Sequence, residues 1–127
     1  MARVLIVEDD TSIASMYKFK LQQGGYEVKH AENGEAGLQL AKDFNPQLIL
    51  LDLRMPVMAG DTMLQELRQH DWGSEMRVII LTNISRAEAP SILRFLNVDR
   101  YIIKAHHTPA QVLEIVKEIV KPAGAIK

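Results

Sequence analysis

The sequence predicts an α/β fold in which five parallel strands alternate with five helices, (βα)5. Short apolar runs alternate with segments of helical periodicity along the chain, which is typical of a parallel sheet with helical crossovers. Four of the apolar runs are followed directly by acidic, hydroxyl or amine side chains. Ligands of open α/β sheets bind where the carboxyl ends of the strands meet, so these side chains are expected to form one site.

The first strand is expected at residues 3–7, and Asp10 or Thr11 can cap the helix that follows it. Apolar side chains at helical spacing give this helix one buried face: Ile13, Met16, Tyr17 and Leu21. The pair Gly24-Gly25 is expected to end the helix.

The second strand, residues 26–30, alternates apolar and polar side chains, which is typical of a half-exposed strand at the edge of a sheet. Asn33 can cap the second helix. That helix is expected to end at Asn45-Pro46, because the residue before a proline avoids the helical region.

The third strand, residues 48–51, is apolar throughout and is therefore expected at the centre of the sheet. Pro56 and Gly60 mark the loop after it, and Asp61 can cap the third helix. The fourth strand, residues 77–81, is apolar in the same way.

A fourth helix is expected to begin near Pro90, since proline suits a first turn, and to end with Asn97 in the left-handed conformation. The fifth strand is expected at residues 100–103, and Thr108-Pro109 provides the cap and first turn of a fifth helix. Its apolar side chains lie at helical spacing: Val112, Ile115, Val116 and Ile119.

Right-handed crossovers with helices on both faces give the strand order 2-1-3-4-5, the flavodoxin-like arrangement. Its switch point lies between the first and third strands, which are followed by Asp9 and Asp52. Together with Glu8, Thr82 and Lys104, these residues make a plausible site for a divalent metal and a phosphoryl group.

Composition narrows the class of protein. A chain of 127 residues predicts one domain, expected at residues 1–121, with residues 122–127 as a tail or the start of a linker. The absence of cysteine excludes disulfides and thiolate metal sites and fits a cytoplasmic location. The net charge of −1 gives no reason to expect direct nucleic-acid binding, and the apolar runs are too short to span a membrane.

At the level of its motifs the chain resembles the receiver domain of two-component response regulators over nearly its whole length. The matching residues are Glu8-Asp9, Asp52 followed by Met55-Pro56 and Gly60, Thr82, Tyr101 and Lys104. Their joint spacing makes the match specific, with 30 residues from Asp52 to Thr82 and 22 from Thr82 to Lys104. The resemblance implies a phosphorylation-controlled signalling switch with chemistry directed only at its own phosphoryl group.

The resemblance assigns Asp52 as the phosphoacceptor and implies Mg²⁺ as the cofactor. Asp9, Asp52 and the backbone carbonyl of Arg54 would bind the ion directly, and Glu8 would act through water. The family pattern also places Lys104 and Thr82 against the phosphoryl oxygens.

Tyr101 would respond to Thr82 by a change of side-chain rotamer, as the aromatic residue does at this position in the family. The expected donor is a histidine kinase or a phosphotransfer protein. An output domain or target could dock on the surface formed by the fourth helix, the fifth strand and the fifth helix, and a homodimer is a further option.

Two departures from the family pattern lie beside the site. Ala105 follows the lysine where the family usually has a proline in a cis bond, so the loop is expected to be trans and differently shaped. Asn83 stands where alanine or glycine is common and could narrow access to the phosphoryl group. Arg54 and Ile84 flank the route of an attacking water and are expected to influence phosphoryl lifetime.

Two other functions compete with the switch. A phosphate-independent pseudo-receiver is the main alternative, because of Ala105 and Asn83. An aspartyl-phosphate phosphatase of the haloacid-dehalogenase type is disfavoured, because it would carry a second acid two residues after the nucleophile, where this chain has Arg54.

Overall fold

A computed structural model describes residues 1–122 of the chain, so the predicted tail at 122–127 lies almost wholly outside the described residues. Five strands form one parallel sheet in the order β2-β1-β3-β4-β5, as predicted. The strands are β1 Arg3–Val7, β2 Glu27–Ala31, β3 Leu48–Leu51, β4 Arg77–Thr82 and β5 Arg100–Ile103. Four α-helices are present in this part of the chain: α1 Thr11–Gln23, α2 Gly34–Phe44, α3 Gly60–Arg68 and α4 Pro109–Ile119.

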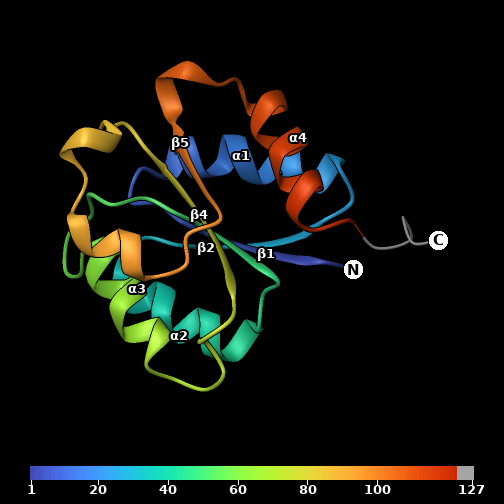
Figure 1. The fold of residues 1–127 in the computed structure, drawn as a ribbon. Helices are drawn as coiled ribbons and strands as arrows, with labels where there is room; N and C mark the ends of the chain where they lie inside the picture. Colours follow the sequence, from blue (N-terminus) through green and yellow to red (C-terminus); the bar gives the residue numbers. More distant parts are fainter. Residues whose placement is uncertain (123–127) are drawn as a thin grey trace.

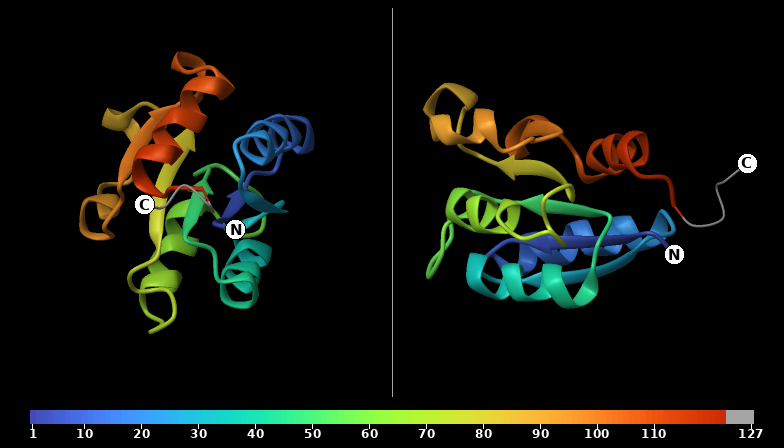
Figure 2. Two further views of the ribbon diagram at one scale, coloured as in Figure 1. Left: turned by 90° about the vertical axis from the view of Figure 1, so that its right-hand side faces the viewer. Right: turned by 60° about the horizontal axis from the view of Figure 1, so that its bottom comes forward.

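The helices cover both faces of the sheet, with α1 and α4 on one side and α2 and α3 on the other (Figures 1 and 2). Each layer encloses its own buried cluster, because alternate strand residues point to opposite faces. All four residues of β3 are buried, which confirms its central place. This two-sided burial is what allows near-continuous apolar strands.

Four predicted helix ends are confirmed by their hydrogen bonds. The Asp10 carboxylate, rather than the Thr11 hydroxyl, caps α1 by accepting from Ile13 N at 3.1 Å. Asn33 caps α2, and Asn45 ends that helix with a left-handed φ of 52°. In α4, Thr108 and Gln111 form a reciprocal capping box with a proline in the first turn.

The predicted cap of the third helix is wrong. The helix begins at Gly60, after Ala59, and no side chain caps it, so Asp61 lies within the first turn. Gly60 donates its N–H to Leu53 O at 3.0 Å, and a Cβ at this position would lie 2.0 Å from Asp52 O. Because only glycine allows this close approach, the helix starts directly against the backbone of the site.

Three boundaries in two strands differ by one residue from the prediction, because both ends of β2 and the end of β4 lie one residue further along the chain. β2 starts at Glu27, because Tyr26 donates its N–H to Leu21 O and so closes the end of α1. β4 extends to Thr82, which pairs with Ile103 of β5.

The predicted fourth α-helix is also wrong. The connection between β4 and β5 contains two short 3-10 segments, Arg86–Glu88 and Ser91–Phe95. Pro90 lies between them, and the backbone bonds after it close 3-10 turns: Leu93 donates its N–H to Pro90 O at 3.2 Å, and Leu96 donates to Leu93 O at 3.2 Å. Asn97 does adopt the predicted left-handed conformation, with φ 56°.

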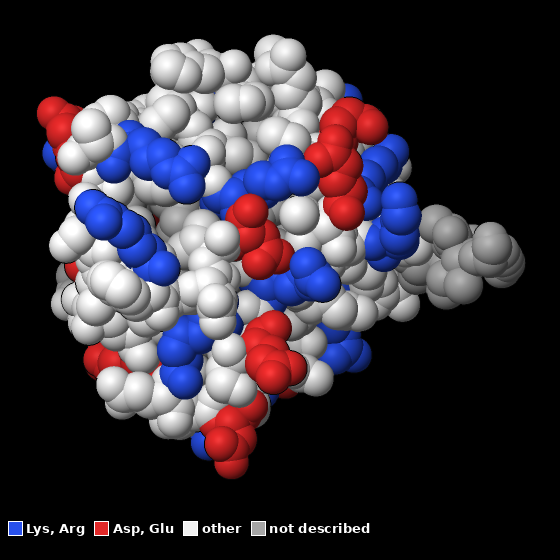
Figure 3. All heavy atoms as spheres, viewed as in Figure 1, with Lys and Arg blue, Asp and Glu red and all other residues white. Residues whose placement is uncertain are grey.

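The surface carries both signs of charge. Figure 3 shows Lys and Arg interspersed with Asp and Glu on the face viewed, in keeping with the net charge of −1. Within residues 1–122, no helix combines the length and the apolar character that a membrane span requires.

Candidate functional site

The strand register brings the predicted acids to one edge of the sheet. Val7 of β1 lies beside Leu51 of β3, and Asp52 donates its N–H to Val7 O at 3.0 Å. The residues that directly follow these two strands therefore emerge side by side. Glu8 and Asp52 are buried, with 4% and 7% of their surface exposed, whereas Asp9 is exposed.

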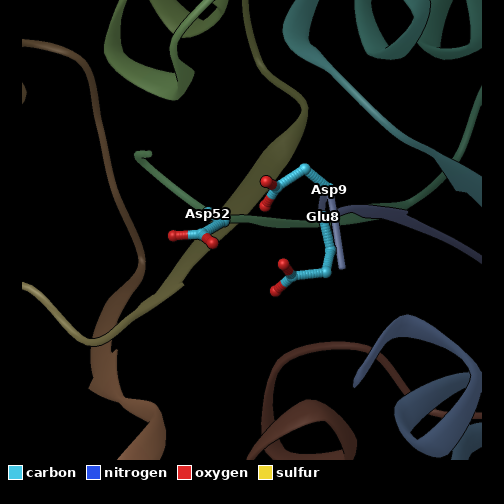
Figure 4. Close-up of side chains that lie close together, drawn as sticks. All are labelled: Glu8, Asp9 and Asp52. Atoms are coloured by element: carbon cyan, nitrogen blue, oxygen red, sulfur yellow. The ribbon is translucent and has the colours of Figure 1, made fainter. Parts of the chain in front are cut away.

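Glu8, Asp9 and Asp52 form a cluster of carboxylates. One ligand oxygen from each residue lies within 4.8 Å of the others. Figure 4 shows the three side chains close together, with the carboxylates of Glu8 and Asp9 directed to the side where Asp52 lies. Hard oxygen donors in such an arrangement suit Mg²⁺, and a cation would also relieve their mutual repulsion.

Lys104 pairs with two of these acids. Its Nζ lies 3.0 Å from Asp52 Oδ2 and also donates to Glu8 Oε1. Burial opposes the charge on this ammonium, but the hydrogen bonds to Glu8 and Asp52 together outweigh it and raise the pKa of Lys104. The amine is therefore firmly protonated at neutral pH.

Glu8 is held by more than the lysine. Burial raises the pKa of its carboxyl, while the bonds from Lys104 and from Asp10 N, at 3.0 Å, act in the opposite direction. His30 Nε2 lies 2.6 Å from the backbone carbonyl of Glu8 and donates to it. No sequence signal pointed to His30, because the alternating pattern of an edge strand does not indicate which polar side chain turns to the next strand.

Asp52 is oriented from two sides. Its Oδ1 accepts from Leu53 N at 2.7 Å, and its Oδ2 accepts from Lys104. The carboxylate is thus fixed, with a different hydrogen-bond donor on each of its two oxygens.

Thr82 and Tyr101 meet at the backbone of Ile84. Thr82 Oγ1 lies 3.4 Å from Ile84 N, a long contact in which the hydroxyl is the acceptor. The Tyr101 hydroxyl donates to Ile84 O at 2.7 Å, and burial raises the pKa of this phenol, which favours the protonated donor. This shared backbone segment links the two residues, and strand spacing alone did not indicate it.

The three residues expected to control access lie at the rim. Arg54 is exposed, and its side chain makes no hydrogen bond or ion pair within residues 1–122. Asn83 is exposed and accepts the N–H of Ala105 at 3.1 Å, while Ile84 is half-buried. No peptide bond in the described residues is cis, which matches the expected trans bond before Ala105.

Comparisons with known proteins agree with this geometry. The family model for the response regulator receiver domain matches residues 4–118. The chain is 35% identical over 88 residues to the DNA-binding dual master transcriptional regulator RpaA of Synechocystis, over 69% of this chain and 36% of that protein. It spans less than half the length of this and four other curated relatives that it matches.

Two solved structures show the same fold. The Vibrio cholerae chemotaxis protein CheY4 superposes with a TM-score of 0.86 at 28% identity, covering 94% of this chain and 99% of that one. The response regulator protein TrrA of Thermotoga maritima, solved in complex with Mg²⁺-BeF, gives a TM-score of 0.82 at 31% identity. That match covers 94% of this chain and 100% of TrrA.

Proposed function

The chain belongs to the response regulator receiver domain family, and from this premise we propose that it is a phosphorylation-controlled signalling switch. Asp52 accepts a phosphoryl group from the phosphohistidine of a histidine kinase or phosphotransfer protein, with Mg²⁺ as cofactor. One observation carries the proposal: one oxygen from each of three carboxylates lies within 4.8 Å of the others, and the Lys104 ammonium binds two of these acids, Glu8 and Asp52.

Asp52 supplies the nucleophile. A carboxylate oxygen attacks phosphorus, the bond from phosphorus to the donor imidazole nitrogen breaks, and the electron pair stays on that nitrogen. The bonds from Leu53 N and Lys104 Nζ fix the carboxylate before the donor arrives, so its orientation costs no further reorganisation.

The acid cluster fits the cation that this family implies. Asp9 and Asp52, with the backbone carbonyl of Arg54, would hold it, and Glu8 would act through water. When bound, Mg²⁺ would offset the negative charge of the carboxylates and the phosphoryl oxygens. The related TrrA structure is a complex with Mg²⁺-BeF, which supports the same assignment here.

Lys104 and Thr82 complete the set of groups that receive the phosphoryl oxygens. The ammonium can exchange its hydrogen bond to Asp52 for one to a phosphoryl oxygen. The Thr82 hydroxyl acts as an acceptor toward Ile84 N, so its own proton is free to be donated to another phosphoryl oxygen. Movement of Thr82 would disturb the Ile84 backbone and, through it, Tyr101. We propose this chain of contacts as the switch.

The output surface lies beside Tyr101. The 3-10 segments and β5 enclose a hollow of about 650 Å³, and its lining includes Tyr101, Arg86 and Arg94. A target or an output domain would dock there, as would a second copy of the chain in a homodimer. The transcriptional role printed for RpaA makes a DNA-binding output domain reasonable for a longer protein, while this domain itself is not proposed to bind nucleic acid.

The test is phosphoryl transfer from acetyl phosphate with Mg²⁺, read by intact mass. We expect the wild type to gain one phosphoryl group and Asp52→Asn to gain none. Asp10→Asn is the matched control, because asparagine still caps α1 while one nearby charge is removed, and it should be labelled like the wild type. An unlabelled wild type would overturn the proposal and favour the pseudo-receiver.

A further inference from the structure

We propose that Asn83 is a positioning residue that ties the ends of β4 and β5 together and so sets the place of Lys104 relative to Thr82. Its Oδ1 atom accepts a hydrogen bond from the backbone N–H of Ala105 at 3.1 Å. The proposal rests on the proposed function, because that function gives Thr82 and Lys104 their roles at the phosphoryl group.

The bond lies just beyond the last pair of the sheet. The β4–β5 register ends with Thr82 beside Ile103, so the next residues on each chain have left the ladder. Asn83 directly follows Thr82, and Ala105 directly follows Lys104. The hydrogen bond between Asn83 and Ala105 therefore connects the backbone next to Thr82 to the backbone next to Lys104.

The backbone of the Lys104 turn is otherwise held by a hydrogen bond along its own chain. The residues Lys104–His106 form a 3-10 turn, closed by His107 N donating to Lys104 O at 3.3 Å. Within residues 1–122, the Asn83–Ala105 bond is the one hydrogen bond that joins this turn to the segment leaving β4.

The two residue types fit each other chemically. A side-chain amide oxygen is an acceptor that can reach a neighbouring strand end, and alanine provides an N–H that proline would lack. Asn83 and Ala105 are the two positions at which this chain departs from the receiver pattern beside the lysine. The structure makes these two departures partners in a single contact.

The placement of Lys104 depends on the backbone at this turn. Its Nζ must lie 3.0 Å from Asp52 Oδ2 while it also reaches Glu8. Because the Asn83–Ala105 bond is exposed to solvent, its loss is expected to slow phosphoryl uptake by only about two- to fivefold, the lower range for one hydrogen bond.

A double-mutant cycle tests this role. Asn83→Ala is made in the wild type, in Ala105→Pro, which has no N–H, and in Ala105→Ser, which keeps it. The initial rate of uptake from acetyl phosphate with Mg²⁺ is read by intact mass. We expect Asn83→Ala to slow uptake about two- to fivefold in the wild type and the serine background, and not at all in the proline background. Equal slowing in all three backgrounds would overturn the proposal.

A second measurement needs no phosphoryl donor, so it separates this inference from the proposed function. Amide hydrogen exchange at Ala105 and the side-chain NMR signals of Lys104 are compared in Asn83→Asp, which keeps the acceptor, and Asn83→Leu, which has a similar shape without one. We expect faster exchange at Ala105 and shifted Lys104 signals only in the leucine variant. Identical behaviour of the two variants would overturn the proposed positioning role of Asn83, whether or not the wild type can be phosphorylated.

Discussion

Lys104 is the residue on which the electrostatics of the site depends most. It is buried between Glu8 and Asp52, and its side chain is 10% exposed. One ammonium balances only one of two buried carboxylates, and the exposed Asp9 adds a third negative charge. The cluster therefore keeps a net negative charge with the lysine in place, and a bound cation would neutralise this charge.

Replacing Lys104 by methionine should destabilise the protein, because Glu8 and Asp52 would then lie buried and unpaired. The loss of one partner from a buried pair costs about 3–5 kcal/mol, and water entering from the open edge should keep the loss at the lower end of that range. Urea unfolding measures it. Added Mg²⁺ should return more stability to Lys104→Met than to the wild type, and equal gains would contradict this account.

The sequence was informative about single residues wherever a strand ends in a polar group. Glu8, Asp9, Asp52, Thr82 and Lys104 all follow from that rule, and the structure places the acids and the lysine together. Contacts that depend on side-chain rotamers did not follow. Examples are the contacts of Lys104 with Glu8, of His30 with the Glu8 carbonyl, and of Tyr101 with the Ile84 carbonyl.

At the scale of elements, the segment after β4 shows how a local signal can be misread. Pro90 suits the first turn of a helix, but here it separates two 3-10 segments. The end of the second segment is held from α3 instead, because the Arg68 guanidinium donates to Leu96 O at 2.8 Å and to Asn97 O at 3.0 Å. A long-range partner of this kind leaves no trace in the local pattern.

Tyr26 links two other elements and predicts a pH dependence. Tyr26 directly precedes β2, and its hydroxyl donates to Val120 O, just after α4; burial raises the pKa of Tyr26 to about 12. The unfolded phenol ionises near its ordinary value of 10, so the folded state is favoured below that pH. Stability should therefore fall between about pH 10 and pH 12, by at most about 1.4 kcal/mol per pH unit.

Tyr26→Phe removes the titrating group and should flatten this alkaline decline. The measurement is the urea midpoint at several values between pH 9 and pH 11, compared with the wild type. The variant should be less stable at pH 9, where only the hydrogen bond is lost, and the two proteins should converge as the pH rises. Parallel curves would show that another group controls the decline.

At the scale of the whole molecule, the site exists because parallel strands end at one edge. Glu8 and Asp52 follow β1 and β3, whereas Lys104 follows β5, on the far side of β4. Folding brings these segments together from opposite ends of the chain, so a ligand that requires all of them stabilises the whole fold.

Mg²⁺ should therefore raise the stability of the complete domain. At about one hundred times its Kd, a ligand that binds only the folded state adds about 2.7 kcal/mol. We expect the urea midpoint of the wild type to rise with Mg²⁺ concentration, and Asp9→Asn to lose most of that gain. Asp10→Asn should keep the gain, and a similar loss in both variants would indicate unspecific charge screening.

The sequence by itself determined the order of the strands and the residues that gather at their carboxyl edge. Hydrophobic periodicity and strand-end polarity are local signals, and the handedness of the crossovers turns them into one topology. Tertiary structure decided the rest. It determined that Glu8 as well as Asp52 binds Lys104, that the chain after β4 forms no α-helix, and that the N–H of Ala105 donates to Asn83. Each outcome depends on atoms that are distant in sequence and meet only after folding.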